Sequence, residues 1–160
     1  MVKQFITTLR QEIGLYKELI AHLQEEKQLL ARRRRDELYQ IANTIETLVF
    51  KIKGVDGLRS RMAEELVFLA GAGQRQGVAS VGVTLTTVIG VVEEYHKGEL
   101  MNLQSIIASL VDTIKELNRE NSIITSRSIE NINTAFQFLQ ELSTTGVYKP
   151  TGKLYDSRYE

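Results

Sequence analysis

The sequence predicts an all-α protein: an elongated antiparallel bundle of three to four long, coiled-coil-like helices with a flexible C-terminal tail. Two long stretches, residues 15–53 and 99–145, contain neither glycine nor proline, the residue types that most often interrupt a helix. Apolar residues recur in them at alternating spacings of three and four, the pattern of helices that pack along one stripe. The single proline, Pro150, follows the last of these stretches.

The first predicted helix begins near the N-terminus and ends near residue 30. Its stripe has one lysine among apolar residues: Ile6, Leu9, Ile13, Tyr16, Ile20, Leu23, Lys27 and Leu30. Continuing the stripe leads to Arg34 and Glu37, which are charged. We therefore predict a tight turn at the four arginines 32–35, with Asp36 as the candidate cap of the next helix. One long helix that changes face at this run is the alternative.

The second predicted helix begins near residue 38 and ends at Gly71-Ala72-Gly73. Nine of its ten stripe positions are apolar: Leu38, Ile41, Ile45, Leu48, Ile52, Val55, Arg59, Met62, Leu66 and Leu69. Gly54 and Gly57 lie within it, and each costs about 1 kcal/mol relative to alanine in a helix interior. We therefore expect a kink or a short interruption at these glycines.

A loop and then a short helix from about Thr84 are expected next, with Leu85, Val88 and Val92 on one face. The valines and threonines of this segment also fit a strand, but a lone strand would have nothing to pair with. The uncharged segment 76–92 has 17 residues, fewer than the roughly 20 mostly apolar residues that a membrane span needs. No membrane-spanning segment is predicted.

The last predicted helix covers residues 98–143, and its stripe shifts near Asn121. The stripe runs through Leu103, Ile107, Leu110, Ile114, Leu117, Asn121 and Ile124, and then through Ile129, Ile132, Phe136 and Leu139. A stripe that shifts can pack on its own bundle along one part and leave the other part free. An asparagine within such a stripe either fixes the register of helix pairing or forms a polar feature of a groove that receives a partner helix.

We divide the chain into a helical bundle domain, residues 1–146, and a flexible tail, residues 147–160. The tail carries three tyrosines, Tyr148, Tyr155 and Tyr159. Tyrosine is a favoured interface anchor, so the tail is either a partner-binding segment or a solvated chain end.

Composition and motif spacing exclude most other classes of protein. Twenty basic and twenty acidic residues give a net charge of zero, whereas nucleic-acid-binding proteins usually carry a basic excess. The absence of cysteine excludes disulfides, cysteine nucleophiles and cysteine-ligated metals. Glu93-x-x-His96 has the spacing of a di-iron ligand pair, but the other histidine, His22, has Leu19 three residues before it, so the second motif is missing. We predict no enzyme activity, no catalytic residue, no metal and no cofactor.

A more specific pattern spans the last predicted helix and the tail. It reads Leu117-Asn118-Arg119-Glu120-Asn121, then Ile123-Ile124, Ile129-Glu130-Asn131 and, opening the tail, Val147-Tyr148. This pattern resembles the C-terminal half of the FlgN family, the cytosolic flagellar export chaperones, whose members combine Leu-Asn-x-x-Asn, an apolar stretch and a tail of the Tyr-Gly-x-x-Gly type. The N-terminal half resembles the family's first hairpin more weakly.

The resemblance implies a cytoplasmic chaperone that binds the C-terminal helices of the hook–filament junction proteins FlgK and FlgL and delivers them to the export gate protein FlhA. We expect the client surface in residues 121–142, with these contacts: Asn121, Ile124, Ile129, Ile132, Phe136 and Leu139. Tyr148 matches the tyrosine that the family uses at the gate, although Lys149 replaces the glycine that follows it. The alternative is a structural coiled-coil adaptor or a homo-oligomeric scaffold without a client.

Overall fold

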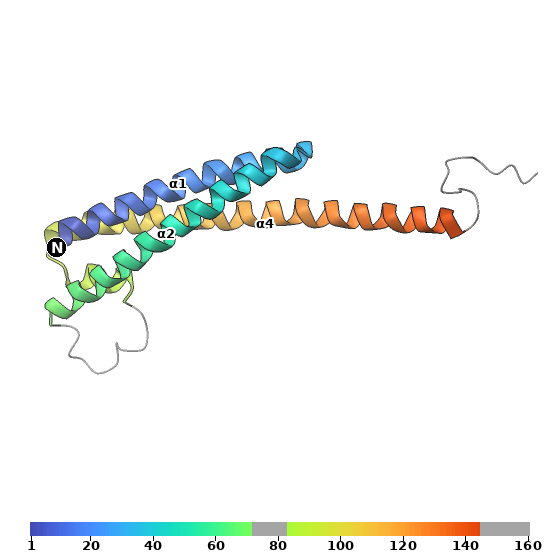
Figure 1. The fold of residues 1–160 in the computed structure, drawn as a ribbon. Helices are drawn as coiled ribbons and strands as arrows, with labels where there is room; N and C mark the ends of the chain where they lie inside the picture. The colour runs from blue at the N-terminus through green and yellow to red at the C-terminus, as the bar shows by residue number, and fades with distance from the viewer. Residues whose placement is uncertain (72–82, 145–160) are drawn as a thin grey trace, which may run out of the picture. The chain divides into compact units, whose positions relative to one another are not determined.

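The computed structural model describes residues 1–71 and 83–144, and all the regular secondary structure in this part of the chain is helical, as predicted. Its helices are α1 (Val2–Arg32), α2 (Arg35–Leu69), α3 (Leu85–Val91) and α4 (Glu94–Thr144) (Figure 1). Chain contacts divide the protein into two units, Met1–Asn121 and Ser122–Glu160, and α4 contributes to both. The predicted boundary after residue 146 lies outside the described residues.

Within Met1–Asn121, successive long helices run antiparallel. Arg59 Nε of α2 lies 3.1 Å from Glu12 Oε2 of α1, and Met62 Sδ of α2 accepts a hydrogen bond from the Thr8 hydroxyl of α1. Residue numbers therefore rise along α1 as they fall along α2. Ion pairs at two points, Arg10–Glu99 at 2.6 Å and Lys27–Glu120 at 2.8 Å, show that α4 runs parallel to α1 and so antiparallel to α2.

The turn between α1 and α2 lies at the arginine run, where the sequence predicted it. Arg33 adopts the left-handed conformation, with φ of 55° and ψ of 36°. Its N–H donates to the Leu30 carbonyl at 3.3 Å, and the N–H of Arg34 donates to the Leu29 carbonyl at 3.2 Å. This pair of bonds is the Schellman motif, which satisfies two carbonyls at the end of the helix.

Asp36 is not the cap of α2, so this prediction was wrong. Arg34 occupies the N-cap position, and its side chain makes no capping hydrogen bond. Asp36 lies one residue inside the helix, in its first turn together with Glu37. There a carboxylate stabilises the helix through the positive end of the helix dipole instead. α2 begins at Arg35, directly after the Schellman turn, so Asp36 lies within the helix rather than before it.

Arg33 gives a first testable prediction. We expect Arg33→Gly to raise the free energy of unfolding by about 0.5–1 kcal/mol, because the left-handed conformation strains every residue with a Cβ and glycine's larger unfolded-state entropy offsets only part of that relief. Arg32→Gly, in the helical last turn, is the matched control and should lower stability. Urea denaturation measures both changes, and a loss of stability in Arg33→Gly would contradict the strain at this position.

α2 continues without interruption through Gly54 and Gly57, so the short interruption that was one of the two expectations at these glycines was wrong. Packing of the α2 stripe on α1 stabilises the helix more than the two glycines weaken it, since tertiary contacts supply most helix stability in proteins. A Cβ at either glycine would meet no atom within 4 Å. α2 ends at Leu69, close to the predicted Gly71; Ala72 and Gly73 lie outside the described residues.

The core consists of two clusters spaced along the bundle. The first contains Phe5, Ile6, Leu9, Ile13, Ala63, Leu66, Val67, Val88, Val92, Leu100 and Leu103. The second contains Leu19, Leu23, Leu48 and Leu117. The predicted short helix contributes Val88, which is fully buried, and Thr84 caps that helix by accepting a hydrogen bond from the Thr87 N–H at 3.2 Å. The predicted stripes of the first two helices, apart from the exposed Leu69, and the stripe of the last helix from Leu103 to Leu117 therefore lie on the faces that form the core.

Candidate functional site

Asn121 is buried against α1 and fixes the position of α4. Its side chain is 5% exposed, and its Nδ2 donates to the Leu23 carbonyl at 3.0 Å and to Glu26 Oε2 at 2.7 Å. The neighbouring Lys27–Glu120 ion pair joins the same two helices. Because both hydrogen bonds need α4 at one height along α1, they support the interpretation of Asn121 as a residue that specifies register.

The other predicted contacts follow Asn121 along α4, in the unit that begins at Ser122. Ile124 is half-buried, and Ile129 is 55% exposed. Ile123, which was not among the predicted contacts, is also exposed. Ile132, Phe136 and Leu139 are part of α4, but their side chains lie outside the described part of the chain, as does the whole of Tyr148. All six predicted client positions therefore lie within α4.

A buried polar network that the sequence analysis missed lies between α1 and α2. Glu12 is 1% exposed, accepts a hydrogen bond from the Tyr16 hydroxyl at 2.7 Å and pairs with Arg59, which also pairs with Asp56. Arg59 was the one charged residue in the predicted stripe of the second helix. A charge at such a position needs a partner, so Arg59 was a signal that α1 supplies a carboxylate opposite it.

Two members of the network, Tyr16 and Arg59, have raised pKa values and stay protonated. Burial, followed by the hydrogen bond to Glu12, raises the pKa of Tyr16 above its usual range, so Tyr16 remains a hydrogen-bond donor. Burial opposes the charge of Arg59, but the hydrogen bond to Asp56 and the charges of Glu12 and Asp56 outweigh it and raise the pKa of Arg59. Every member contacts another member, so this arrangement is suited to holding α1 and α2 together rather than to proton transfer.

The described residues offer no metal site and no membrane span. No group of three or more histidine, aspartate or glutamate side chains in residues 1–71 and 83–144 is placed to hold a metal ion. Among the helices of that part, none is both long and apolar enough to cross a membrane. The two histidines lie on different helices and have different neighbours. On α1, His22 Nδ1 lies 3.7 Å from Glu25 Oε2. On α4, the ring of His96 stacks edge-on against the ring of Tyr95.

Helices α1 and α2 form a hairpin, and α4 packs against it as a third long helix. Exposed isoleucines lie along the end of α4. This arrangement defines a helical protein-binding module. The family model for FlgN protein matches residues 1–156. The chain therefore belongs to the FlgN family, as the Leu-Asn-x-x-Asn pattern and the tail tyrosine indicated. Members of this family are flagellar export chaperones for FlgK and FlgL and are not enzymes. Neither a curated protein nor a solved structure matches the chain.

Proposed function

We propose that this chain works in the cytoplasm, holds the C-terminal helices of FlgK and FlgL on residues 121–142 of α4, and delivers them to FlhA through the tail around Tyr148. The observation that carries the client site is the shift of the apolar stripe after Asn121. Asn121 ends the stripe that packs against α1, and Ile129 opens the next one and is 55% exposed. An exposed apolar stripe on a helix is the surface that an amphipathic client helix needs.

Spacing supports the choice of client contacts beyond Ile129. Ile132, Phe136 and Leu139 follow it at intervals of three, four and three residues, which is the spacing of positions that share one face of a helix. We propose these four apolar positions, which span about three turns of helix, as the client strip. Asn133 and Gln137, which lie between these positions in the sequence, are exposed.

The proposed client strip predicts the outcome of a calorimetric titration of the full chain with C-terminal peptides of FlgK and FlgL. Ile132→Glu with Phe136→Glu should weaken binding at least about 100-fold, because interface anchors carry most of the binding energy. Asn133→Glu with Gln137→Glu adds the same charges at the same spacing on the adjacent face and should leave binding nearly unchanged. Equal losses in the two double variants, or loss of helical circular dichroism in the first, would contradict the client strip.

The same titration separates the tail from the client strip. In our proposal Tyr148→Ala leaves peptide binding unchanged and weakens the binding of the chaperone–client complex to the cytosolic part of FlhA. Weaker client binding in Tyr148→Ala would instead place the tyrosine in the client site.

A further inference from the structure

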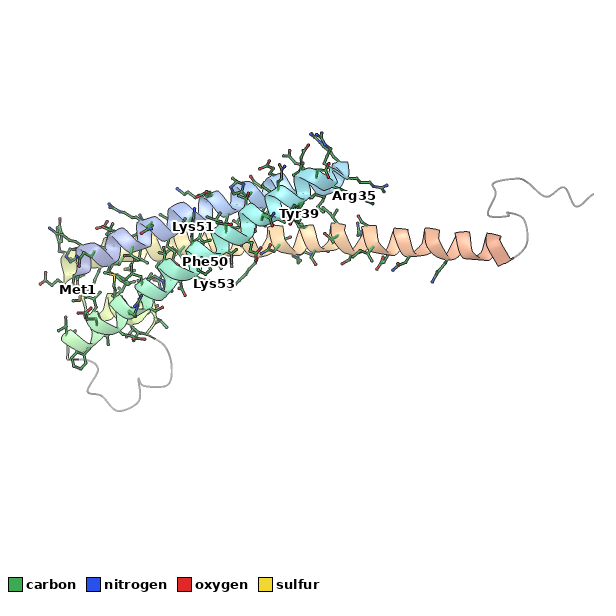
Figure 2. All side chains as sticks on the ribbon, viewed as in Figure 1. Met1, Arg35, Tyr39, Phe50, Lys51 and Lys53 are labelled. Atoms are coloured by element: carbon green, nitrogen blue, oxygen red, sulfur yellow. The ribbon has the colours of Figure 1, made fainter. Side chains whose placement is uncertain are left out.

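The end of the hairpin where α1 meets α2 carries four consecutive arginines, residues 32–35, which we call the arginine tip. All four are exposed. Arg33 and Arg34 form the turn itself, and their neighbours end α1 and begin α2. Figure 2 shows Arg35 at this end of the hairpin, with Tyr39 close by on α2. Four long cationic side chains are therefore presented together at one end of the helical pair.

Most of the positive charge of the arginine tip is not neutralised within the chain. Arg34 pairs with Glu37, whereas the other three arginines form no ion pair within the described part of the chain. Counting Asp36 and Glu37, residues 32–37 carry four positive and two negative charges, a net charge of +2. A partner that offers negative charge at this end of the hairpin would therefore meet unpaired guanidinium groups.

The carboxylates behind the tip limit the shape of such a partner. Glu25 and Glu26 lie on α1 seven and six residues before Arg32, which is about 10 Å along a helix. A strand of nucleic acid that lay along the hairpin would meet these carboxylates as well as the arginines. For a partner that touches only the tip, they lie about one Debye length away at physiological salt, so their repulsion is largely screened. A broad anionic surface therefore suits the tip better than a polyanionic strand.

The side chains at the tip match the headgroup layer of an anionic lipid bilayer. Guanidinium groups bind phosphate oxygens through charge-assisted hydrogen bonds. Successive residues of a helix do not share a face, so one small anion cannot reach all four arginines, whereas a bilayer offers a phosphate to each. Tyr39 is 73% exposed and lies four residues after Arg35, on the same face of α2. Tyrosine is enriched at the level of the headgroups.

We propose that the arginine tip is a docking site for an anionic membrane surface, with its guanidinium groups on the lipid phosphates and Tyr39 beside them. The contact is electrostatic and reversible, because a net charge of +2 provides only modest attraction to such a surface. This role goes beyond the proposed chaperone function, because it uses the end of the hairpin and neither residues 121–142 of α4 nor Tyr148.

Co-sedimentation of the full chain with lipid vesicles tests the proposal. The probes are vesicles of phosphatidylcholine with about 30% phosphatidylglycerol, which is anionic, and vesicles of phosphatidylcholine alone. We expect binding to the anionic vesicles at about 50 mM salt and little binding to the neutral ones. Binding should be lost at about 500 mM salt, because salt screens the attraction between the tip and the headgroups.

Two triple variants with the same change in net charge locate the site. The tip variant replaces the three unpaired arginines: Arg32→Gln, Arg33→Gln and Arg35→Gln. The control removes three exposed positive charges elsewhere on α2: Lys51→Gln, Lys53→Gln and Arg61→Gln. The tip variant should weaken partitioning onto the anionic vesicles at least about tenfold, with unchanged circular dichroism, and the control less than about threefold. If the tip variant lost helical signal, Arg32→Gln with Arg35→Gln, which leaves the turn residues unchanged, would replace it.

Four outcomes would overturn the proposal. The first is a parent chain that does not bind the anionic vesicles. The second is an equal loss in the two triple variants, because net charge rather than the tip would then be responsible. The third is displacement by inorganic phosphate at the concentration of accessible lipid phosphate, which would make the tip a site for free phosphate. The fourth is a single-stranded RNA oligonucleotide that binds the parent chain more tightly than the vesicles do and does not bind the tip variant.

Discussion

Arg59→Leu is expected to lower the free energy of unfolding by about 3–5 kcal/mol, because it leaves a buried carboxylate without its partner. Glu12 is 1% exposed, and Arg59 is the cation that lies 3.1 Å from it. Tyr16 would still donate a hydrogen bond to Glu12, but one neutral donor cannot replace a guanidinium. Urea denaturation followed by circular dichroism measures the loss.

Two further variants test the cause of this loss. Combining Glu12→Gln with Arg59→Leu removes the unpaired charge and should recover a substantial part of the lost stability. Arg10→Leu removes the Arg10–Glu99 ion pair, whose side chains are 66% and 39% exposed, and should cost less than about 1 kcal/mol. If the double variant were no more stable than Arg59→Leu, packing of the arginine side chain rather than its charge would be responsible.

Leu23→Ala should have the second largest effect, a loss of about 2–5 kcal/mol. Leu23 is 2% exposed and belongs to the smaller core cluster, with Leu19, Leu48 and Leu117. Truncation would leave a cavity where α1, α2 and α4 meet. The long helices cannot collapse into it easily, because their hydrogen bonds and ion pairs fix their register.

The matched control is Leu69→Ala, since Leu69 is also on a long helix but is 64% exposed. It should change stability by less than about 0.5 kcal/mol. Thermal and urea denaturation of the two variants would compare one substitution in two environments. Equal effects would show that the smaller cluster contributes little to the stability of the bundle.

The helices and their buried faces could be predicted because heptad spacing is a local property of the sequence. The stripes through Leu9 and Leu48 both form core, and the turn lies at the arginines where the two stripes go out of phase. The errors arose where tertiary contacts outweigh local preference. Gly54 and Gly57 do not break α2, because packing along the whole helix compensates for them, and the position of Asp36 depends on the geometry of the Schellman turn.

The candidate site could be predicted only in part, for a different reason. Spacing showed that Asn121 lies in an apolar stripe but left two interpretations, and the hydrogen bond to the Leu23 carbonyl, which supports the register interpretation, depends on how α1 and α4 pack. The burial of Glu12 could not be predicted, because the residue opposite it depends on how α1 and α2 pair. Ile129 and Phe50 are exposed because no other helix covers their faces in the described part of the chain. A sequence with apolar residues on several helix faces does not specify which of those faces is covered.

The short turn at Arg33 and Arg34 also affects the order in which the chain folds. α1 and α2 are joined by two residues, so the hairpin closes through contacts between residues near the turn, and such local contacts form quickly. During synthesis the hairpin can form once Leu69 has left the ribosome, before α4 has emerged. Leu100 and Leu103 complete the larger core cluster, so until they emerge the nascent hairpin exposes the apolar surface that α4 later covers.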